Sequence, residues 1–371
     1  MKTKVWQVIW GLKEGGAETL AREYARMVDP QFFEPTVVTM YPFEDTANYR
    51  RAMEAGIHVR SVFKKRNVIT RAVRVLFGKW YVPAILKKML KQEKPDAIHF
   101  NSPIAYCFIP LQQQLSGVKL LYTCHSEVNK HFFAEEENAV RQLIQVYKLR
   151  LIALHEDMKK ELDQRFGTDS TVVIRNGIDI DRFRKPQTSR RDTLQSIGIS
   201  QDAYVVGHIG RFSEAKNHGF LLKVFQELAR RKPNARLLLI GNGELREQIT
   251  EEIRRLHLEG RVTMLAHRTD ISDLLHAMDV MVFPSLYEGL SVTLVEAQAA
   301  GLRCVISDAI NPANLLSENT IPVSLDADAG EWADIVLNTE IKNAEHGNLE
   351  DYDMNREIHR LERLYLGELD V

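Results

Sequence analysis

Short apolar, β-branched runs alternate with longer segments of helical periodicity along most of the chain. In the first half such runs predict strands at Val5–Ile9, Pro35–Met40, His58–Val62, Ala97–His99, Val118–Thr123, Arg150–Leu154 and Val172–Ile174. Short apolar strands separated by helices are typical of parallel sheets that are covered on both faces. This half is therefore predicted to form a doubly wound α/β domain.

The same alternation begins again after the polar stretch RKPQTSRRDT (Arg184–Thr193), which is interpreted as a linker region. The strands predicted after it are Tyr204–Ile209, Ala235–Ile240, Val262–Leu265, Val280–Phe283 and Cys304–Ser307. The chain thus predicts two tandem α/β domains, 1–185 and 186–345, with ligands bound outside the carboxyl ends of the strands and a cleft between the domains. The last segment, 346–371, has apolar residues spaced for an amphipathic helix that is free to pack on either domain.

Length and composition agree with this organisation. A chain of 371 residues is long enough for about two domains, and its 44% apolar and 27% charged residues argue against disordered and coiled-coil classes. Three widely spaced cysteines give neither a disulfide framework nor a zinc-binding spacing, which favours a reducing cytoplasm. The apolar stretch at the N-terminus is too short for a signal peptide or a membrane span and is interpreted as the first strand.

Charge is balanced overall but not locally. The net charge of −1 gives no general attraction to nucleic acid. The stretch from Lys64 to Lys91, in contrast, holds nine Lys and Arg residues and no acidic residue, interleaved with Phe77, Trp80 and Tyr81.

Two loops that follow predicted strands have residues suited to binding phosphate. Gly15 and Gly16 lie between the first strand and a helix, where a helix N-terminus favours an anion, although a simple tight turn is an alternative interpretation. Neither the dinucleotide-binding nor the P-loop glycine pattern is present. Arg211 and Lys216 lie five residues apart after the strand 204–209, where they could meet a diphosphate or form a solvated surface pair.

Two glutamates and one histidine are the other candidates. Glu288 precedes a helix predicted over Ser291–Ala300, and Glu296 lies inside it, so the two acids need not face each other as a catalytic dyad would. Each could instead be a solvated surface acid. His125 follows a strand at the expected ligand-binding edge, but a lone histidine is more often structural. The acids of Asp179–Asp181 belong to a turn signal, and no metal site is predicted.

Four stretches taken together resemble a known family. GGAE, VIRNGIDIDRF, GRFSEAKNH and FPSLYEGLSVTLVEAQAAG occur in an order similar to that of the retaining nucleotide-sugar glycosyltransferases of the GT-B fold, in glycosyltransferase family 4. The resemblance covers nearly the whole chain, and the two glutamates within their flanking sequence are its most specific element. Within that family, the stretch EAQAAGLRCVISDA most closely resembles the branch of bacterial exopolysaccharide and capsule synthesis.

The resemblance implies an N-terminal acceptor-binding domain, a C-terminal nucleotide-sugar-binding domain and metal-independent transfer that requires no cofactor. A UDP-sugar donor is favoured over a GDP-sugar on family prevalence alone, and the acceptor would be a glycan or a lipid-linked glycan. A cytoplasmic enzyme at the inner face of the cell membrane is expected, with the Lys64–Lys91 stretch in contact with anionic lipid. A solvated helix face over the domain core is the alternative interpretation of that stretch.

The roles of individual residues follow from the same resemblance. Glu288 would contact hydroxyls of the donor sugar, Glu296 the ribose hydroxyls, and His125 the transferred sugar. Arg211 and Lys216 would neutralise the diphosphate. The other implied donor contacts are Gly16, the base-pocket residue Leu265, and the residues after Glu288, namely Gly289, Leu290, Ser291, Val292 and Thr293. The sequence departs from the family at Asn101, where a histidine is frequent, and at Ala266, where glycine is common.

Two other functions use the same scaffold. A hydrolase or epimerase would bind the nucleotide sugar without transferring it to an acceptor. A non-catalytic subunit of polysaccharide assembly would keep the fold, although the presence of Glu288, Glu296, Arg211 and Lys216 argues against it.

Overall fold

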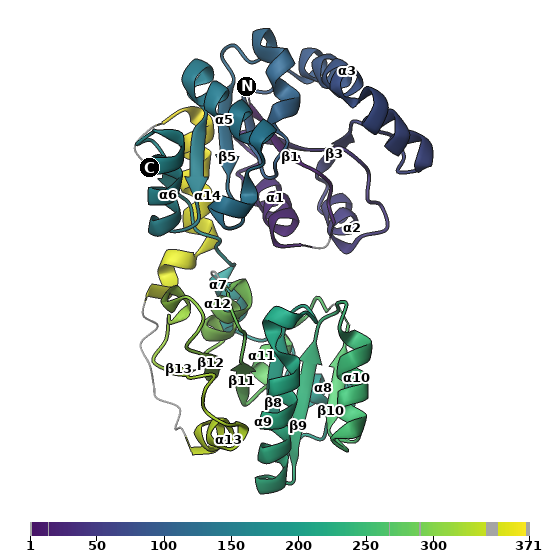
Figure 1. The fold of residues 1–371 in the computed structure, drawn as a ribbon, viewed down its shortest axis with the longest axis vertical. Helices are drawn as coiled ribbons and strands as arrows, with labels where there is room; N and C mark the ends of the chain where they lie inside the picture. The colour runs from purple at the N-terminus through teal and green to yellow at the C-terminus, as the bar shows by residue number, and fades with distance from the viewer. Residues whose placement is uncertain (1, 14, 267, 289–290, 339–347, 369–371) are drawn as a thin grey trace. The chain divides into compact units, whose positions relative to one another are not determined.

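The computed structural model describes residues 2–13, 15–266, 268–288, 291–338 and 348–368, except for the side chains of Lys130 and Asn348. The chain divides into two compact units (Figure 1). The first consists of Met1–Asn176 together with Asn355–Val371, and the second of Gly177–Met354. Each unit is built around one parallel sheet.

The sheet of the first unit has seven strands in the order β3-β2-β1-β4-β5-β6-β7, all parallel. The strands are β1 (Thr3–Ile9), β2 (Phe33–Thr39), β3 (His58–Ser61), β4 (Ala97–Phe100), β5 (Lys119–Thr123), β6 (Arg150–Ala153) and β7 (Val172–Val173). The strand order reverses between β1 and β4, so the loops after these two strands meet at the edge where doubly wound sheets bind ligands.

Helices cover this sheet on both faces (Figure 1). They are α1 (Gly16–Met27), α2 (Ala47–Glu54), α3 (Val68–Glu93), η1 (Ala105–Gln114), α4 (Val128–His131), α5 (Ala134–Tyr147), α6 (Glu156–Phe166) and α14 (Met354–Leu366). Side chains of β1 alternate between the faces: Trp6 and Val8 join the larger core cluster, whereas Ile9 joins a smaller one. Among the described residues, no helix combines the length and the hydropathy that crossing a bilayer requires.

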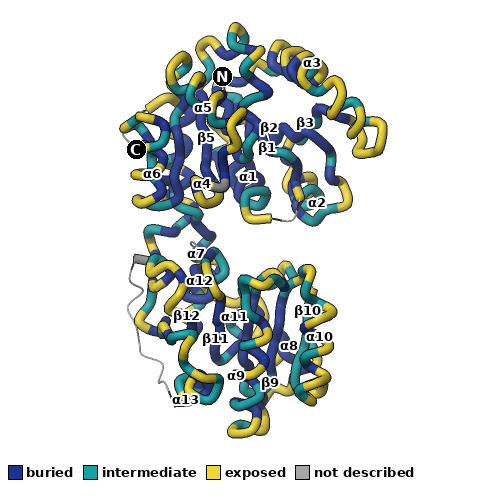
Figure 2. The backbone as a smooth tube through the Cα atoms, viewed as in Figure 1, coloured by how far each residue is buried: buried dark blue, intermediate teal, exposed yellow. Residues whose placement is uncertain are grey.

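The second unit repeats the pattern with six parallel strands in the order β10-β9-β8-β11-β12-β13. Its strands are β8 (Tyr204–Ile209), β9 (Ala235–Ile240), β10 (Val262–Leu265), β11 (Val280–Phe283), β12 (Cys304–Ser307) and β13 (Thr320–Val323). Its helices are α7 (Ile180–Arg184), α8 (Arg190–Ser196), η2 (Glu214–Lys216), α9 (His218–Arg231), α10 (Arg246–Arg255), α11 (Ile271–Ala277), α12 (Val292–Ala299), η3 (Pro312–Asn314), α13 (Ala329–Asn338) and η4 (Asn348–Tyr352). Figure 2 shows its buried strands between more exposed helices.

The sequence predicted this architecture except at one strand and one boundary. Strand β13 was not predicted, because its sequence TIPV carries Pro322, which is tolerated here at the last strand of the sheet. The units separate at 176/177, nine residues before the predicted boundary at 185/186. The reason is that Ile178, Ile180 and Phe183 pack in the core of the second unit. At the other end of the chain, α14 belongs to the first unit, while η4 belongs to the second.

Candidate active site

The loops after β8 and β11 lie side by side in the second unit. The two strands pair directly, with Val280 opposite Val206 and Met281 opposite Gly207, and the strand order reverses between them. A backbone bond from the N–H of Leu286 to the carbonyl of Ala215, at 2.8 Å, joins the two loops. The basic residues after β8 and the glutamate after β11 are therefore brought to the same edge of the sheet.

At this edge Lys216 forms an ion pair with Glu288. The ammonium Nζ donates to Glu288 Oε1, and only 14% and 18% of the two side chains are exposed. The same Nζ lies 4.5 Å from the centroid of the Phe283 ring, within range of a cation–π contact. The structure thus joins two predicted site residues that are 72 positions apart in the sequence.

Gly210 leaves room for the stem of this lysine. A Cβ atom at residue 210 would lie 3.1 Å from Lys216 Cε and 3.3 Å from its Cδ, closer than packed carbon atoms normally approach. The glycine after β8 therefore allows the lysine side chain to pass over the backbone.

Arg211 is placed differently from its predicted partner. Its side chain is 73% exposed and its Nε donates to Glu244 Oε2 at 3.1 Å. An exposed pair of this kind contributes little to stability. Arg211 is thus held by a weak partner, whereas Lys216 is held firmly.

A buried amide network fixes the start of α12. The N–H of Ser291 donates to Asn314 Oδ1 at 2.8 Å, and Gln298 Nε2 donates to the Asn314 carbonyl at 2.9 Å. Gln298 Oε1 in turn accepts from the N–H of Leu316 at 2.8 Å and from Thr320 Oγ1 at 2.7 Å. Asn314 and Gln298 are almost fully buried, so the network orients the helix rather than a ligand.

This network changes one detail of the prediction. Because the Ser291 N–H already has an acceptor, it is not available to an anion in this arrangement. The next N–H groups, of Val292 and Thr293, open α12 and have no acceptor within the helix. Gly289 and Leu290, which were also predicted to contact the donor, lie outside the described residues.

Glu296 lies in α12, one turn beyond Val292, and is partly buried. Burial raises the pKa of its carboxyl group to about 7, and the guanidinium of Arg182 opposes part of that effect. Arg182 comes from α7, which packs against α12. It was not singled out from the sequence, although it lies within the VIRNGIDIDRF stretch, and no local signal places it beside Glu296.

The raised pKa of Glu296 predicts a pH-dependent effect on stability. Between the ordinary pKa of a glutamate and about 7, the folded chain keeps a proton that the unfolded chain has released, so ionisation destabilises the fold as the pH rises. Glu296→Gln removes this titration. We expect its melting temperature, measured relative to the unmodified chain, to increase between pH 5 and pH 8. A difference in melting temperature between the two proteins that stays constant from pH 5 to pH 8 would contradict the expectation.

Leu265 ends β10 and is partly buried against the core of the second unit. Its carbonyl accepts from the N–H of Gly241 at 3.0 Å, which connects the ends of β10 and β9. Gly241 has φ +153°, and a Cβ there would lie 1.9 Å from the carbonyl oxygen of Gly210, so the backbones after β8 and β9 approach closely. Leu265 keeps its predicted place at the carboxyl end of a strand.

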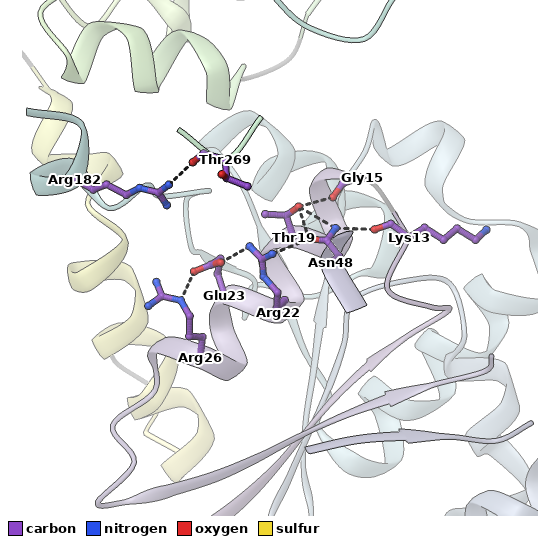
Figure 3. A network of polar contacts seen from close by, with 9 residues as sticks. All are labelled: Lys13, Gly15, Thr19, Arg22, Glu23, Arg26, Asn48, Arg182 and Thr269. Atoms are coloured by element: carbon purple, nitrogen blue, oxygen red, sulfur yellow. Dashed lines mark hydrogen bonds and ion pairs between the residues drawn. The ribbon is translucent and has the colours of Figure 1, made fainter. Parts of the chain in front are cut away.

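In the first unit, side chains of α1 and α2 hold the glycine loop after β1 (Figure 3). Asn48 Nδ2 donates to the carbonyl of Lys13 at 2.7 Å, and Arg22 Nη1 donates to Asn48 Oδ1 at 2.9 Å. Thr19 Oγ1 donates to the Gly15 carbonyl at 2.9 Å. A Cβ at Gly16 would contact no other atom, so the space beside the first residue of α1 is open.

His125 follows β5, and its neighbour on β4 is Asn101. His125 Nε2 lies 3.3 Å from Asn101 Oδ1, while Nδ1 is buried and has no hydrogen-bond partner among the described residues. Burial lowers the pKa of His125 to about 3, assisted by His131, so the ring is neutral at physiological pH. At this position, where the sequence departs from the family that it resembles, Asn101 thus supplies an amide.

The acids at Asp179–Asp181 have local structural partners. Asp179 caps α7 by accepting from the N–H of Arg182 at 3.2 Å, and Asp181 pairs with Arg184 at 3.4 Å. Within the described ranges, no three His, Cys, Asp or Glu side chains gather as a metal site would require.

Comparisons with known proteins agree with this arrangement. The model of the family described as "Glycosyltransferase Family 4" matches residues 14–182, and the model of the family described as "Glycosyl transferases group 1" matches residues 189–336. EpsF of Bacillus subtilis, named as a glycosyltransferase, is 32% identical over 319 residues, which are 83% of this chain and 79% of EpsF. The chain belongs to the family 4, group 1 glycosyltransferases.

Other proteins are similar in sequence or in fold. An Escherichia coli protein named as a UDP-Gal:α-D-GlcNAc-diphosphoundecaprenol α-1,3-galactosyltransferase is 28% identical to this chain. The matched region covers 76% of this chain and 78% of the Escherichia coli protein. The structure of Anabaena HepE in complex with UDP has a TM-score of 0.74 at 21% identity, covering 99% and 100% of the two chains. WaaG, a lipopolysaccharide glycosyltransferase, has a TM-score of 0.66 at 15% identity, covering 98% and 100%. The predicted GT-B fold of two Rossmann-like domains is confirmed.

Proposed function

We propose that this glycosyltransferase moves a sugar from a nucleotide-diphosphate donor to an acceptor hydroxyl, with retention at the anomeric carbon and without a metal ion. The observation that carries the proposal is the Lys216–Glu288 pair at the reversal point of the second sheet. It combines a cation for a diphosphate with an acceptor for sugar hydroxyls. We favour a UDP-sugar, since HepE has been crystallised with UDP and with UDP-glucose.

The residues can supply what the reaction needs. The acceptor oxygen forms a bond to the anomeric carbon as the bond from that carbon to the diphosphate oxygen breaks, and the acceptor proton passes to the departing phosphate. Negative charge develops on the leaving diphosphate, where Lys216, Arg211 and the N–H groups opening α12 would stabilise it. Glu288 would orient the transferred sugar through its hydroxyls, and Glu296 would bind the ribose.

A titration and a product assay test this function. Calorimetric binding of UDP, GDP and ADP identifies the base, and the matching nucleotide sugars then identify the donor. Product analysis with and without a lipid-linked acceptor separates transfer from hydrolysis or epimerisation. We expect acceptor-dependent release of UDP that persists in EDTA, and an anomeric configuration that equals that of the donor. Release without acceptor consumption would contradict transfer.

We also propose that the acceptor is lipid-linked and that α3 contacts an anionic membrane. Seven of the fifteen large apolar side chains exposed in the described part of the chain lie between 68 and 81, which Figure 2 shows as an exposed stretch of α3. They are Val68, Ile69, Val75, Leu76, Phe77, Trp80 and Tyr81. Lysines and arginines without intervening acids surround them. Exposed apolar groups among cations match a bilayer whose surface is negative.

Vesicle co-sedimentation tests the role of α3. Leu76→Ser combined with Trp80→Ser removes two side chains that are 68% and 74% exposed, so the fold should be unaffected. We expect binding to phosphatidylglycerol-containing vesicles to fall at least roughly tenfold, because buried apolar area and charge act together at such a surface. The matched control is Val146→Ser, at a 57% exposed position on α5. Equal binding of both variants would contradict the proposal.

A further inference from the structure

A buried hydrogen-bonded chain in the first unit connects α14 to His125. Its members Gln7, His99, Asn101, Thr123 and Tyr365 are each at most 1% exposed. They come from β1, β4, the residue after β4, β5 and α14. None of these five was among the residues predicted to bind or transfer the sugar.

The orientation of the Asn101 amide is fixed by a carbonyl group. Asn101 Nδ2 lies 3.2 Å from the backbone oxygen of His99, which can only accept a hydrogen bond. The nitrogen must therefore face that oxygen, and Oδ1 must face His125 Nε2 at 3.3 Å. An amide oxygen can only accept, so His125 carries its proton on Nε2.

The orientation of the Gln7 amide follows from the same anchor. Asn101 Nδ2 also donates to Gln7 Oε1 at 2.9 Å, which leaves Gln7 Nε2 to donate to Tyr365 Oη at 2.6 Å. The tyrosine hydroxyl also lies 2.9 Å from His99 Nδ1, and His99 Nε2 lies 2.7 Å from Thr123 Oγ1. Because a hydroxyl group can donate or accept, these two contacts fit either tautomer of His99, whereas the Asn101 amide fixes the proton of His125 on Nε2.

This leaves His125 Nδ1 as an acceptor without a donor. The atom is buried and has no partner among the described residues, and such an atom costs free energy unless a ligand satisfies it. A neutral imidazole nitrogen accepts from a hydroxyl group but cannot bond to a carboxylate or a carbonyl.

We propose that Asn101 is a positioning residue, which fixes His125 in the Nε2–H tautomer and so presents Nδ1 as an acceptor for a sugar hydroxyl. The tautomer of His125 does not depend on the proposed function. Its consequence for sugar transfer does rest on the proposed function. Asn101 acts here through His125, and α14 supports it from the other end of the chain through Tyr365 and Gln7.

Nitrogen-15 NMR of the full-length, ligand-free protein labelled at histidine tests the tautomer directly. Long-range proton–nitrogen correlations distinguish Nε2–H from Nδ1–H rings, and the loss of one signal set in His125→Gln assigns the ring among the twelve histidines. We expect the Nε2–H pattern for His125. An Nδ1–H pattern for His125 in the unmodified protein would overturn the proposal, whatever the enzyme transfers.

Two substitutions of Asn101 test the consequence for transfer. Asn101→Ala removes the acceptor, and we expect mixed tautomers with kcat/KM lowered roughly tenfold, about the value of one hydrogen bond. Asn101→Asp keeps an acceptor but adds a charge that raises the pKa of His125, whose titratable neighbours are His99 on β4 and His131 on α4. Transfer should then fall as the pH drops through that raised pKa, because a protonated ring cannot accept.

The control is Tyr365→Phe, which breaks the bonds to His99 and to Gln7 but leaves the Asn101–His125 contact in place. We expect it to alter the His99 signals and to leave the His125 tautomer unchanged. If Asn101→Ala keeps the Nε2–H tautomer and full kcat/KM, Asn101 is not a positioning residue. If no donor is turned over but the tautomers are as expected, the proposed function fails and the assignment of the tautomer stands.

Discussion

Replacing Lys216 with alanine is expected to lower kcat by roughly 10²–10³-fold, the usual cost of removing one preorganised group that stabilises developing charge. The lysine is held by Glu288, by the Phe283 ring and by the space over Gly210, so its position is set before any ligand binds. A steady-state assay of UDP release with the identified donor and acceptor measures the effect.

Lys232→Ala is the matched control for this substitution. Lys232 Nζ also lies over an aromatic ring, 4.6 Å from the centroid of Tyr204, but that tyrosine begins β8 at the opposite edge of the sheet. Both variants lose a cation–π contact, and only one loses a cation at the carboxyl edge. Comparable activity of the two variants would remove Lys216 from the proposed mechanism, provided that melting curves show both chains folded.

Glu288→Gln should have the second large effect, a loss of kcat of roughly 10²-fold or more, because a neutral amide accepts more weakly from sugar hydroxyls than a carboxylate does. The substitution keeps the size of the side chain. It also removes the ionic partner of Lys216, so part of the loss reflects a displaced cation. The double variant Glu288→Gln with Lys216→Ala separates the loss of sugar binding from the displacement of the lysine. If the two residues share a role, the losses of kcat in the two single variants will be far from additive in the double variant.

Glu296→Gln provides the comparison for Glu288→Gln. If Glu296 binds the ribose and Glu288 the transferred sugar, Glu296→Gln should raise KM for the donor. Glu288→Gln should instead lower kcat. Glu288→Gln with full kcat and an altered KM would show that Glu288 belongs to binding alone. Nucleotide affinity from calorimetry, measured without acceptor, checks the assignment independently.

The strands of both sheets and the glutamate-containing stretch were predictable because each depends on local pattern. Nearly all strands begin and end within two residues of their predicted bounds, since a fully buried parallel strand is a short apolar run closed by a turn. β13 is the exception, because Pro322 in its sequence argues against a strand. A proline is tolerated there only because β13 lies at the edge of the sheet. The boundary of the units was missed because the linker-like composition after 184 does not show that Ile180 and Phe183 are buried.

The sequence by itself determined the fold class, the family and the types of side chain available for the chemistry, because these follow from periodicity and from motifs that are contiguous in the chain. Only the tertiary structure decided which of them meet. It paired Lys216 with Glu288, left Arg211 exposed, committed the Ser291 N–H to Asn314, and placed Asn101 against His125. These contacts join residues that strand order brings to one edge of a sheet, and strand order is set by packing of the whole domain rather than by any segment.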